Sequence, residues 1–204
     1  RNNNIFQYNL ALFQRLEKDT NSGLNDLGKS AREDYVFAAN LYWQDLLVKG
    51  FISQFSFTHN SNQEEGETYF DNNGFIARPA SIGTEISRGY DVSYLGYSGD
   101  GHLGRFNLST SAYYAFGKEN PGVFVREKTD IRAGFFAAEL SRDFDWIRPR
   151  ASFLYASGDD DPFDSTAKGF DSIFENPQFA GSDASYWIRQ SVPLVGGGRV
   201  GLSS

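Results

Sequence analysis

Hydrophobic and polar side chains alternate along most of this chain, and the alternation is longest between Leu103 and Gly117. One parity of this stretch is apolar and the other is polar: Phe106, Leu108, Ala112, Tyr114 and Phe116 against Arg105, Asn107, Ser109, Ser111 and Tyr113. A period of two residues is that of a β-strand with one apolar and one polar face. The preceding segment Tyr90–Ser98 is also strand-like, and the glycines of Gly99–His102 predict a tight turn between the two strands.

The same alternation predicts strands elsewhere in the chain: Asn4–Leu16, Asp34–Gln44, Gly50–Asn60, Ile131–Ser141, Trp146–Ser157 and an eighth candidate at Ser185–Val192. The pattern does not decide which side of Tyr90–Ser98 faces outward, because apolar residues occur at both its even-numbered and its odd-numbered positions. Long polar connections alternate with short ones along the chain: Glu17–Arg32, Ser61–Ser87, Lys118–Thr129 and Gly158–Ala184 against Asp45–Lys49, Gly99–His102 and Arg142–Asp145.

The predicted strands are long enough to cross a membrane, because a lipid-spanning strand needs about 9–11 residues and a soluble one usually has about five or six. Alternating long and short connections are typical of an up-and-down barrel with turns on one side and loops on the other. We therefore predict an all-β fold, a transmembrane antiparallel up-and-down β-barrel in the bacterial outer membrane. Residues 1–204 would form one domain with about eight strands, and a soluble all-β domain is the alternative. We expect a fragment of a longer chain, because Gly201–Ser204 is not a strand that closes on an aromatic residue.

Composition fits this prediction. The 204 residues are 40% hydrophobic, and no window approaches the ~18 consecutive apolar residues of a transmembrane helix. The 19 Phe and 11 Tyr would supply interfacial aromatic girdles. A net charge of −7 argues against nucleic acid as a partner. Without cysteine, the chain has no disulfide, zinc-thiolate or thiol-nucleophile chemistry.

If the apolar parity faces lipid, the polar parity lines a lumen. The lining residues predicted from this are Arg15, Arg105, Asn107, Arg148 and Arg150. Most of the negative charge falls instead in the loops, so a ladder of guanidinium groups in the lumen would lower the barrier for an anionic solute. The alternative, left open here, is that these arginines pair with acidic side chains.

Several segments resemble the alginate-export family of outer-membrane barrels: Asp71–Pro79, Tyr94–Tyr97, Gly99–Asn107, Tyr155–Asp164, Gly169–Asp171 and Phe179–Gly181. The family-like pattern is a strand followed by Ser-Gly-Asp and an acidic loop. The resemblance implies a larger porin-like barrel of about 16–18 strands, with a basic lumen that passes an anionic polysaccharide. It therefore also implies that more strands than those visible here complete the barrel.

The acidic loop suggests a weak calcium site at Asp159, Asp161 and Asp164, with Asp160 and Asp171 nearby. Calcium binds six to eight oxygen ligands, but the spacing here is not that of an EF-hand, and a solvated loop tip is the simpler interpretation. No other cofactor is predicted.

The two histidines, His59 and His102, are expected on opposite sides of the membrane, which argues against a shared metal or a catalytic pair. His59 beside Ser61 is the one candidate for an outer-membrane hydrolase, and we expect the protein not to be an enzyme. The predicted function is a porin-like channel for passive passage or export of an anionic, polysaccharide-like solute. The alternative is a structural barrel that houses a periplasmic or electron-carrying protein partner.

Overall fold

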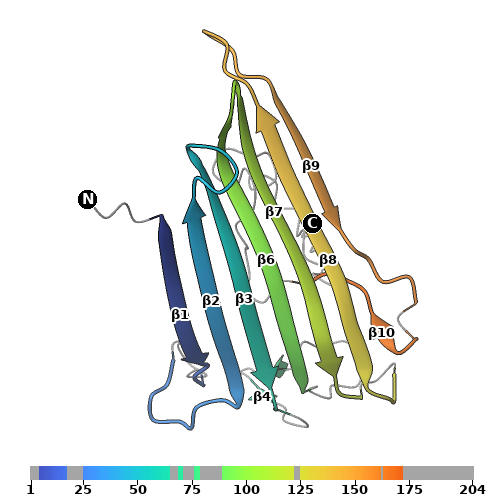
Figure 1. Ribbon diagram of the computed structural model, residues 1–204. Helices are drawn as coiled ribbons and strands as arrows, with labels where there is room; N and C mark the ends of the chain where they lie inside the picture. Colours follow the sequence, from blue (N-terminus) through green and yellow to red (C-terminus); the bar gives the residue numbers. More distant parts are fainter. Residues whose placement is uncertain are drawn as a thin grey trace.

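The structure is a computed structural model that describes residues 5–17, 25–64, 69–70, 76–78, 89–121, 125–161 and 163–171. Within these residues the fold is all-β and consists of one large antiparallel sheet and a small two-stranded one (Figure 1). The strands of the large sheet are β1 (Phe6–Gln14), β2 (Asp34–Gln44), β3 (Phe51–Asn62), β6 (Tyr90–Leu103), β7 (Phe106–Glu119), β8 (Thr129–Ser141), β9 (Arg150–Ala156) and β10 (Thr166–Ala167). The small sheet pairs β4 (Tyr69–Phe70) with β5 (Ile76–Arg78).

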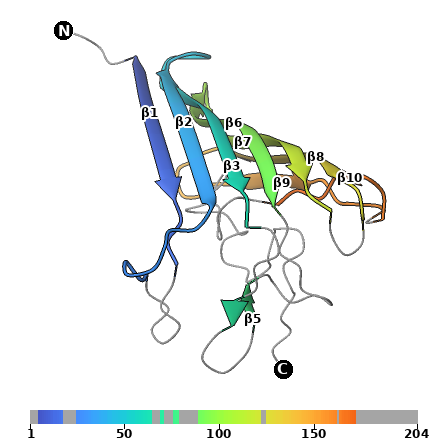
Figure 2. The same ribbon diagram turned by 90° about the horizontal axis from the view of Figure 1, so that it is seen from below.

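The large sheet is a meander, in which β1, β2, β3, β6, β7 and β8 follow one another and each pairs antiparallel with the next. The outer edge of β8 is divided between two strands. β9 pairs antiparallel with Phe135–Ser141, and β10 pairs parallel with Asp130 and Ile131. Figure 2 shows the sheet from below as one continuous layer, with β1 at one edge and β10 at the other.

The predicted strands are confirmed in the described residues. Asp34–Gln44 has the predicted bounds, and the other strands differ from prediction by a few residues at their ends. Two predicted loops contain short strands that the sequence pattern did not indicate: β4 and β5 within Ser61–Ser87, and β10 within Gly158–Ala184. The eighth candidate strand, Ser185–Val192, lies outside the described residues.

The predicted turn at Gly99–His102 is wrong, because those residues belong to β6 and the hairpin turns at Gly104 and Arg105. Gly104 has a φ of 66°, which suits the first central residue of a two-residue hairpin loop. Gly99 serves a different purpose: a Cβ there would lie 2.8 Å from the ring of Phe51. The glycine therefore lets this ring, which is fully buried, lie against the backbone of β6.

Short and long connections lie at opposite ends of the sheet, as the sequence predicts. Asp45 begins one short turn with a φ of 61°, and its Oδ1 accepts a hydrogen bond of 2.6 Å from the Gly50 amide. The strand predicted at Trp146–Ser157 starts only at Arg150. The residues before it form a hairpin tip closed by the Phe144–Ile147 bridge, which carries Arg148 off the sheet.

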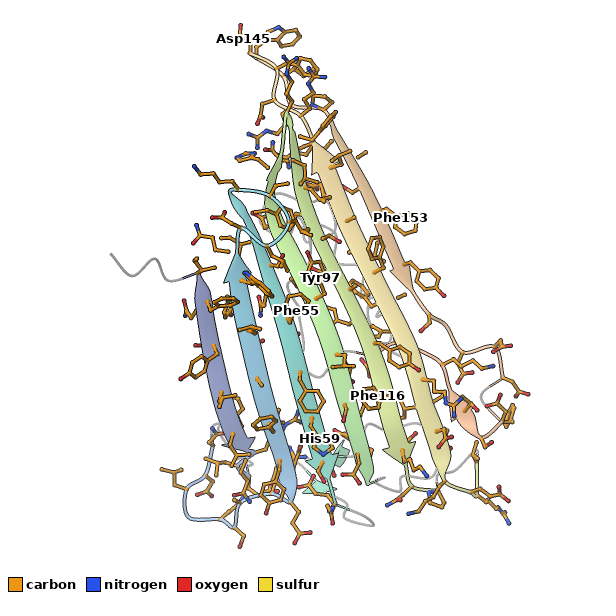
Figure 3. All side chains as sticks on the ribbon, viewed as in Figure 1. Phe55, His59, Tyr97, Phe116, Asp145 and Phe153 are labelled. Carbon is orange, nitrogen blue, oxygen red and sulfur yellow. The ribbon has the colours of Figure 1, made fainter. Side chains whose placement is uncertain are left out.

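The register divides the sheet into two faces, because paired residues of antiparallel strands point to the same side. We call the face that carries Phe55 and Phe153 the apolar face; both are labelled in Figure 3. Its large side chains are solvent-exposed and run across β1, β2, β3, β6, β7, β8 and β9: Tyr8, Leu10, Leu12, Phe37, Leu41, Phe55, Leu95, Tyr114, Phe116, Phe136, Leu140, Phe153 and Tyr155. The register also decides which side of Tyr90–Ser98 lies on the apolar face, because Leu95 and Tyr97 pair there with Phe57 and Phe55.

The other side, the polar face, carries the largest buried cluster among the described residues. Phe170, in the segment after β10, packs there against Phe135 with ring centroids 5.2 Å apart, and against Tyr94 at 6.3 Å. Small side chains on β7 and β8, such as Ala115 and Ala133, make room for it. The core of the described fold thus lies on the polar face, and the apolar face has no comparable cover.

The large sheet is not closed into a barrel within the described residues, where β1 pairs only with β2 and β9 only with β8. The predicted antiparallel sheet is therefore confirmed, but its closure is not. None of the described residues belongs to a helix long and apolar enough to cross a membrane.

Candidate functional site

The polar face of the large sheet carries most of the residues predicted to line a passage, so it is the candidate site. Its charged side chains gather in the rows at the two ends of the strands. One end carries Arg15, Asp34 and Glu119, and the other carries Asp100, Glu139 and Arg150. The predicted arginines are therefore not evenly spaced along the sheet.

Arg15 lies beside an acidic residue rather than alone. Its Nε is 3.1 Å from Oδ2 of Asp34, whose side chain is fully buried. Arg32 lies 3.8 Å from the same oxygen and also forms a bidentate pair with Glu64, with N–O distances of 2.9 and 2.6 Å. The hydrogen bonds to Glu64, which outweigh the opposing effect of burial, raise the pKa of Arg32 above its ordinary value. These four side chains form a charge-balanced cluster that joins the ends of β1, β2 and β3.

Asn107 and Arg148 meet at the opposite end of the sheet through Asp143. The Asn107 Nδ2 donates a hydrogen bond of 2.9 Å to Asp143 Oδ2, and Arg148 donates to Oδ1 of the same carboxylate. The Asn107 amide and then the Arg148 guanidinium hold the pKa of Asp143 below its ordinary range. Arg105, in contrast, occupies the β6–β7 turn and is exposed, so it does not lie on the face of a strand.

Arg150 begins β9, where its Nη1 lies 3.9 Å from Glu139 Oε1. Glu139 also accepts a hydrogen bond of 3.0 Å from Ser152. Three of the four predicted arginines thus have an acidic partner close by. The structure favours local pairing for Arg15, Arg148 and Arg150 over a ladder of unpaired cations.

Between the charged ends, the polar face is uncharged and rich in amides and hydroxyls. Two neighbouring rows of the register cross five strands: Gln7, Tyr42, Gln54, Ser98 and Ser111 in one, and Asn9, Asn40, Ser56, Gly96 and Tyr113 in the other. Gln54 Nε2 donates a hydrogen bond of 3.1 Å to Asn40 Oδ1. The Tyr113 ring lies over Gly96, where a Cβ would come within 2.4 Å of it.

A segment of the chain covers the part of the polar face that belongs to β6, β7 and β8. Ser157 anchors it, since its carbonyl accepts from the Phe170 amide at 2.9 Å and its Oγ donates to the Lys168 carbonyl at 2.6 Å. Tyr94 donates a further hydrogen bond of 3.0 Å to the Asp171 carbonyl. We call residues 157–171 the strap. The side-chain contacts described for Phe170 and Asp171 are with β6, β7 and β8, which lie beside β1, β2 and β3 in the sheet.

The predicted calcium ligands lie in this strap, where their carboxylates accept hydrogen bonds from backbone amides of the same segment. Asp161 Oδ1 accepts from the Phe163 amide at 3.0 Å, and Asp164 Oδ1 from the Thr166 amide at 2.7 Å. Asp159 Oδ1 likewise accepts from the Asp161 amide at 3.3 Å. The described residues contain no group of three or more His, Asp or Glu side chains placed to share a metal ion.

Lys168 neutralises part of the acidic strap. Its Nζ donates a hydrogen bond of 2.8 Å to Asp160 Oδ1 and lies 3.8 Å from Asp164 Oδ2. This hydrogen bond lowers the pKa of Asp160 and raises that of Lys168. Asp171 has a different position, because its backbone carbonyl accepts the hydrogen bond from Tyr94.

The two histidines lie near opposite ends of the sheet, as the sequence predicts. His59 is close to the end of β3, and its Nδ1 lies 2.9 Å from Ser93 Oγ (Figure 3). His102 is close to the end of β6, where it pairs with Asn107 in the register. Ser61, the hydrolase candidate, shares the apolar face with His59, but the nearest hydroxyl described for His59 is that of Ser93.

Two features of the site escaped the sequence analysis. The strap did so because Phe170 lies in a segment with no periodicity, and only an aromatic ring between Gly169 and Asp171 hints at an anchor. The Arg32–Glu64 pair did so because its partners lie 32 residues apart in two predicted loops.

Comparison with known proteins adds nothing to this description, since no family, no curated protein and no solved structure matches the chain.

Proposed function

We propose that the large sheet is part of the wall of an outer-membrane β-barrel, with the apolar face against lipid and the polar face along a water-filled passage for solutes. The observation that carries this proposal is the apolar face. Leu41, Leu95 and Phe153 on three different strands are 37%, 53% and 58% exposed, and they belong to one continuous apolar surface. A soluble protein rarely exposes an apolar surface of this extent.

Strand length supports the same proposal. β6 and β7 have 14 residues each, and β8 has 13. A tilted strand needs only about 9–11 residues to cross a bilayer. The apolar face also becomes polar at one end, where Asp91, Lys118 and Asp130 pair in one row. Such a change is what a strand requires where it leaves the hydrocarbon layer.

A closed barrel is part of the proposal, because lipid offers no partner for the backbone groups along the edge of a sheet. β1 contains no charged residue and no proline between Phe6 and Gln14, and so lacks two of the features that discourage further strand pairing at the edge of a sheet. The resemblance to the alginate-export family agrees with a larger barrel that includes additional strands.

The orientation of the two faces can be tested with single cysteines, because the natural chain has none. Leu41 and Asn40 are neighbours on β2 that point to the apolar and the polar face. After reconstitution in vesicles, an environment-sensitive fluorophore on Leu41→Cys should be quenched by lipid-borne quenchers, and one on Asn40→Cys by aqueous iodide. Equal quenching of both positions by iodide would show that the apolar face is not in lipid.

Passage itself is tested by swelling of liposomes that contain the purified protein. We expect entry of small solutes such as glycerol and glucose, with rates that fall as solute size increases. A sheath that houses a protein partner would cross the membrane and admit solutes only without that partner. Lipid-facing labels combined with no solute entry would therefore reject the passage and keep the membrane location.

A further inference from the structure

Resting on the proposed passage, we infer that its lining along β1, β2 and β3 accepts uncharged polyhydroxylated solutes, such as neutral sugars, in preference to anions. The residues that carry this inference are Gln7, Asn9, Asn40, Tyr42, Gln54 and Ser56, which we call the amide lane. They occupy the two uncharged rows on the part of the polar face that belongs to these three strands. All six are exposed or half-buried.

The charge on this part of the polar face does not favour anions. On the polar face, the described strands β1, β2 and β3 carry one charged residue, Asp34, and Arg15 follows directly after β1. They lie 3.1 Å apart at one end of the face, and their formal charges cancel. An anion entering the amide lane would lose part of its hydration without meeting a compensating cation, which is costly in a narrow passage.

The side-chain amides of the lane match the hydrogen-bonding groups of a sugar. A side-chain amide both donates and accepts hydrogen bonds, and so does a sugar hydroxyl. The hydrogen bond from Gln54 Nε2 to Asn40 Oδ1 holds these two side chains together. It leaves the Gln54 carbonyl available to accept and the Asn40 Nδ2 available to donate, so the pair can receive both kinds of bond from one hydroxyl-bearing solute.

Tyr42 adds an aromatic side chain to the lane. It lies in the same row as Gln7 and Gln54, which pair with it from the strands on either side. An aromatic ring provides an apolar surface with a hydroxyl at its tip. A sugar ring has the same combination of C–H faces and peripheral hydroxyls. The lane therefore offers both surfaces that such a solute can use.

The inference is tested in planar bilayers that contain the purified protein, by measuring how maltotriose and trigalacturonate block the ion current. We expect maltotriose to block at a concentration at least about fivefold lower than trigalacturonate, because each carboxylate would lose hydration in the lane without meeting a compensating cation. The current in a KCl gradient should reverse close to zero potential. Block by trigalacturonate at an equal or lower concentration, or a strong anion preference, would overturn the inference.

Two variants show whether the lane is responsible. Gln54→Leu should raise the half-blocking concentration of maltotriose by about five- to tenfold, since it removes the central amide. Gln14→Leu makes the same chemical change on the apolar face and should leave it within about twofold. Equal effects of the two variants would exclude the lane as the binding surface.

A third variant separates this inference from the proposed function. Asn40→Asp places a negative charge in the lane at nearly constant volume, and should shift the reversal potential towards cation preference if ions pass along it. A current that neither maltotriose nor Asn40→Asp affects would reject the lane and keep the passage. The absence of any current would reject both.

Discussion

Arg15 and Asp34 face each other across the open ends of β1 and β2, with Arg15 Nε 3.1 Å from Asp34 Oδ2. The carboxylate is fully buried, and the arginine side chain is 37% exposed. Because Arg15 is paired with Asp34, the one cation that the sequence predicts for the lining at this end of β1 is neutralised. The pairing also leaves Asp34 dependent on Arg15, because the next cation, Arg32, is 3.8 Å away and already forms a bidentate pair with Glu64.

We predict that Arg15→Gln lowers the free energy of unfolding by about 2–3 kcal/mol, since it leaves a buried carboxylate with weaker compensation. The expected value is below that of a fully buried pair because Arg15 is partly exposed. Urea unfolding in detergent micelles, followed by tryptophan fluorescence, measures the change. Arg148→Gln breaks a pair whose members are 50% and 52% exposed, and should cost less than about 1 kcal/mol. Equal costs for the two variants would contradict the role of burial.

We predict that Gly99→Ala destabilises the protein by about 1–3 kcal/mol, because overpacking a buried site displaces its neighbours. The new Cβ would lie 2.8 Å from both the Phe51 ring and the Tyr97 hydroxyl. Gly134→Ala is the matched control on β8, where a Cβ meets nothing within 4 Å. The same urea experiment applies. A stable Gly99→Ala variant would show that the backbone of β6 needs glycine for neither packing nor turning at this position.

We predict that Phe170→Ala releases the strap from the polar face and costs about 2–3 kcal/mol, because it leaves a cavity against Phe135. Amide hydrogen exchange should become faster across residues 157–171 and change little in β2 and β3. Phe163→Ala removes a ring of the same size from the same strap, but that ring is 69% exposed, so we expect a change below about 0.5 kcal/mol. Unchanged exchange in Phe170→Ala would mean that backbone hydrogen bonds alone hold the strap.

We predict that Asn107→Leu raises the pKa of Asp143, since the Asn107 amide is the main cause of its low value and Arg148 the second. A carboxylate whose pKa is lower in the folded state stabilises the protein above its ordinary pKa, and this contribution is lost as the pH falls through the folded value. The window is therefore below about pH 4. Carbon-13 NMR titration of the Asp143 carboxylate measures it. An unchanged titration in Asn107→Leu would assign the shift to Arg148 alone.

The sequence by itself determined the long strands and, outside Tyr90–Ser98, their two faces. Alternation with a period of two is a local property, so Asp34–Gln44 could be read with its bounds, and Leu10 and Asn9 could be assigned to opposite faces. Prediction from the sequence was wrong where one residue type can serve two structural purposes. Glycines near Gly99 resemble a turn, but one of them makes room for the Phe51 ring, which comes from a strand 48 residues earlier.

Only the tertiary structure decided what the polar face offers a solute. The pairing of Arg15 with Asp34, of Arg148 with Asp143 and of Arg150 with Glu139 depends on register and on hairpin geometry, which periodicity does not specify. The same holds for Phe170, because a ring in an aperiodic segment reaches its partners only through the course of the chain after β9. Alternation fixes the side of the sheet to which a side chain points, since that follows from the strand backbone alone. The groups that neutralise or cover that side chain belong to strands and loops distant in sequence, so alternation does not identify them.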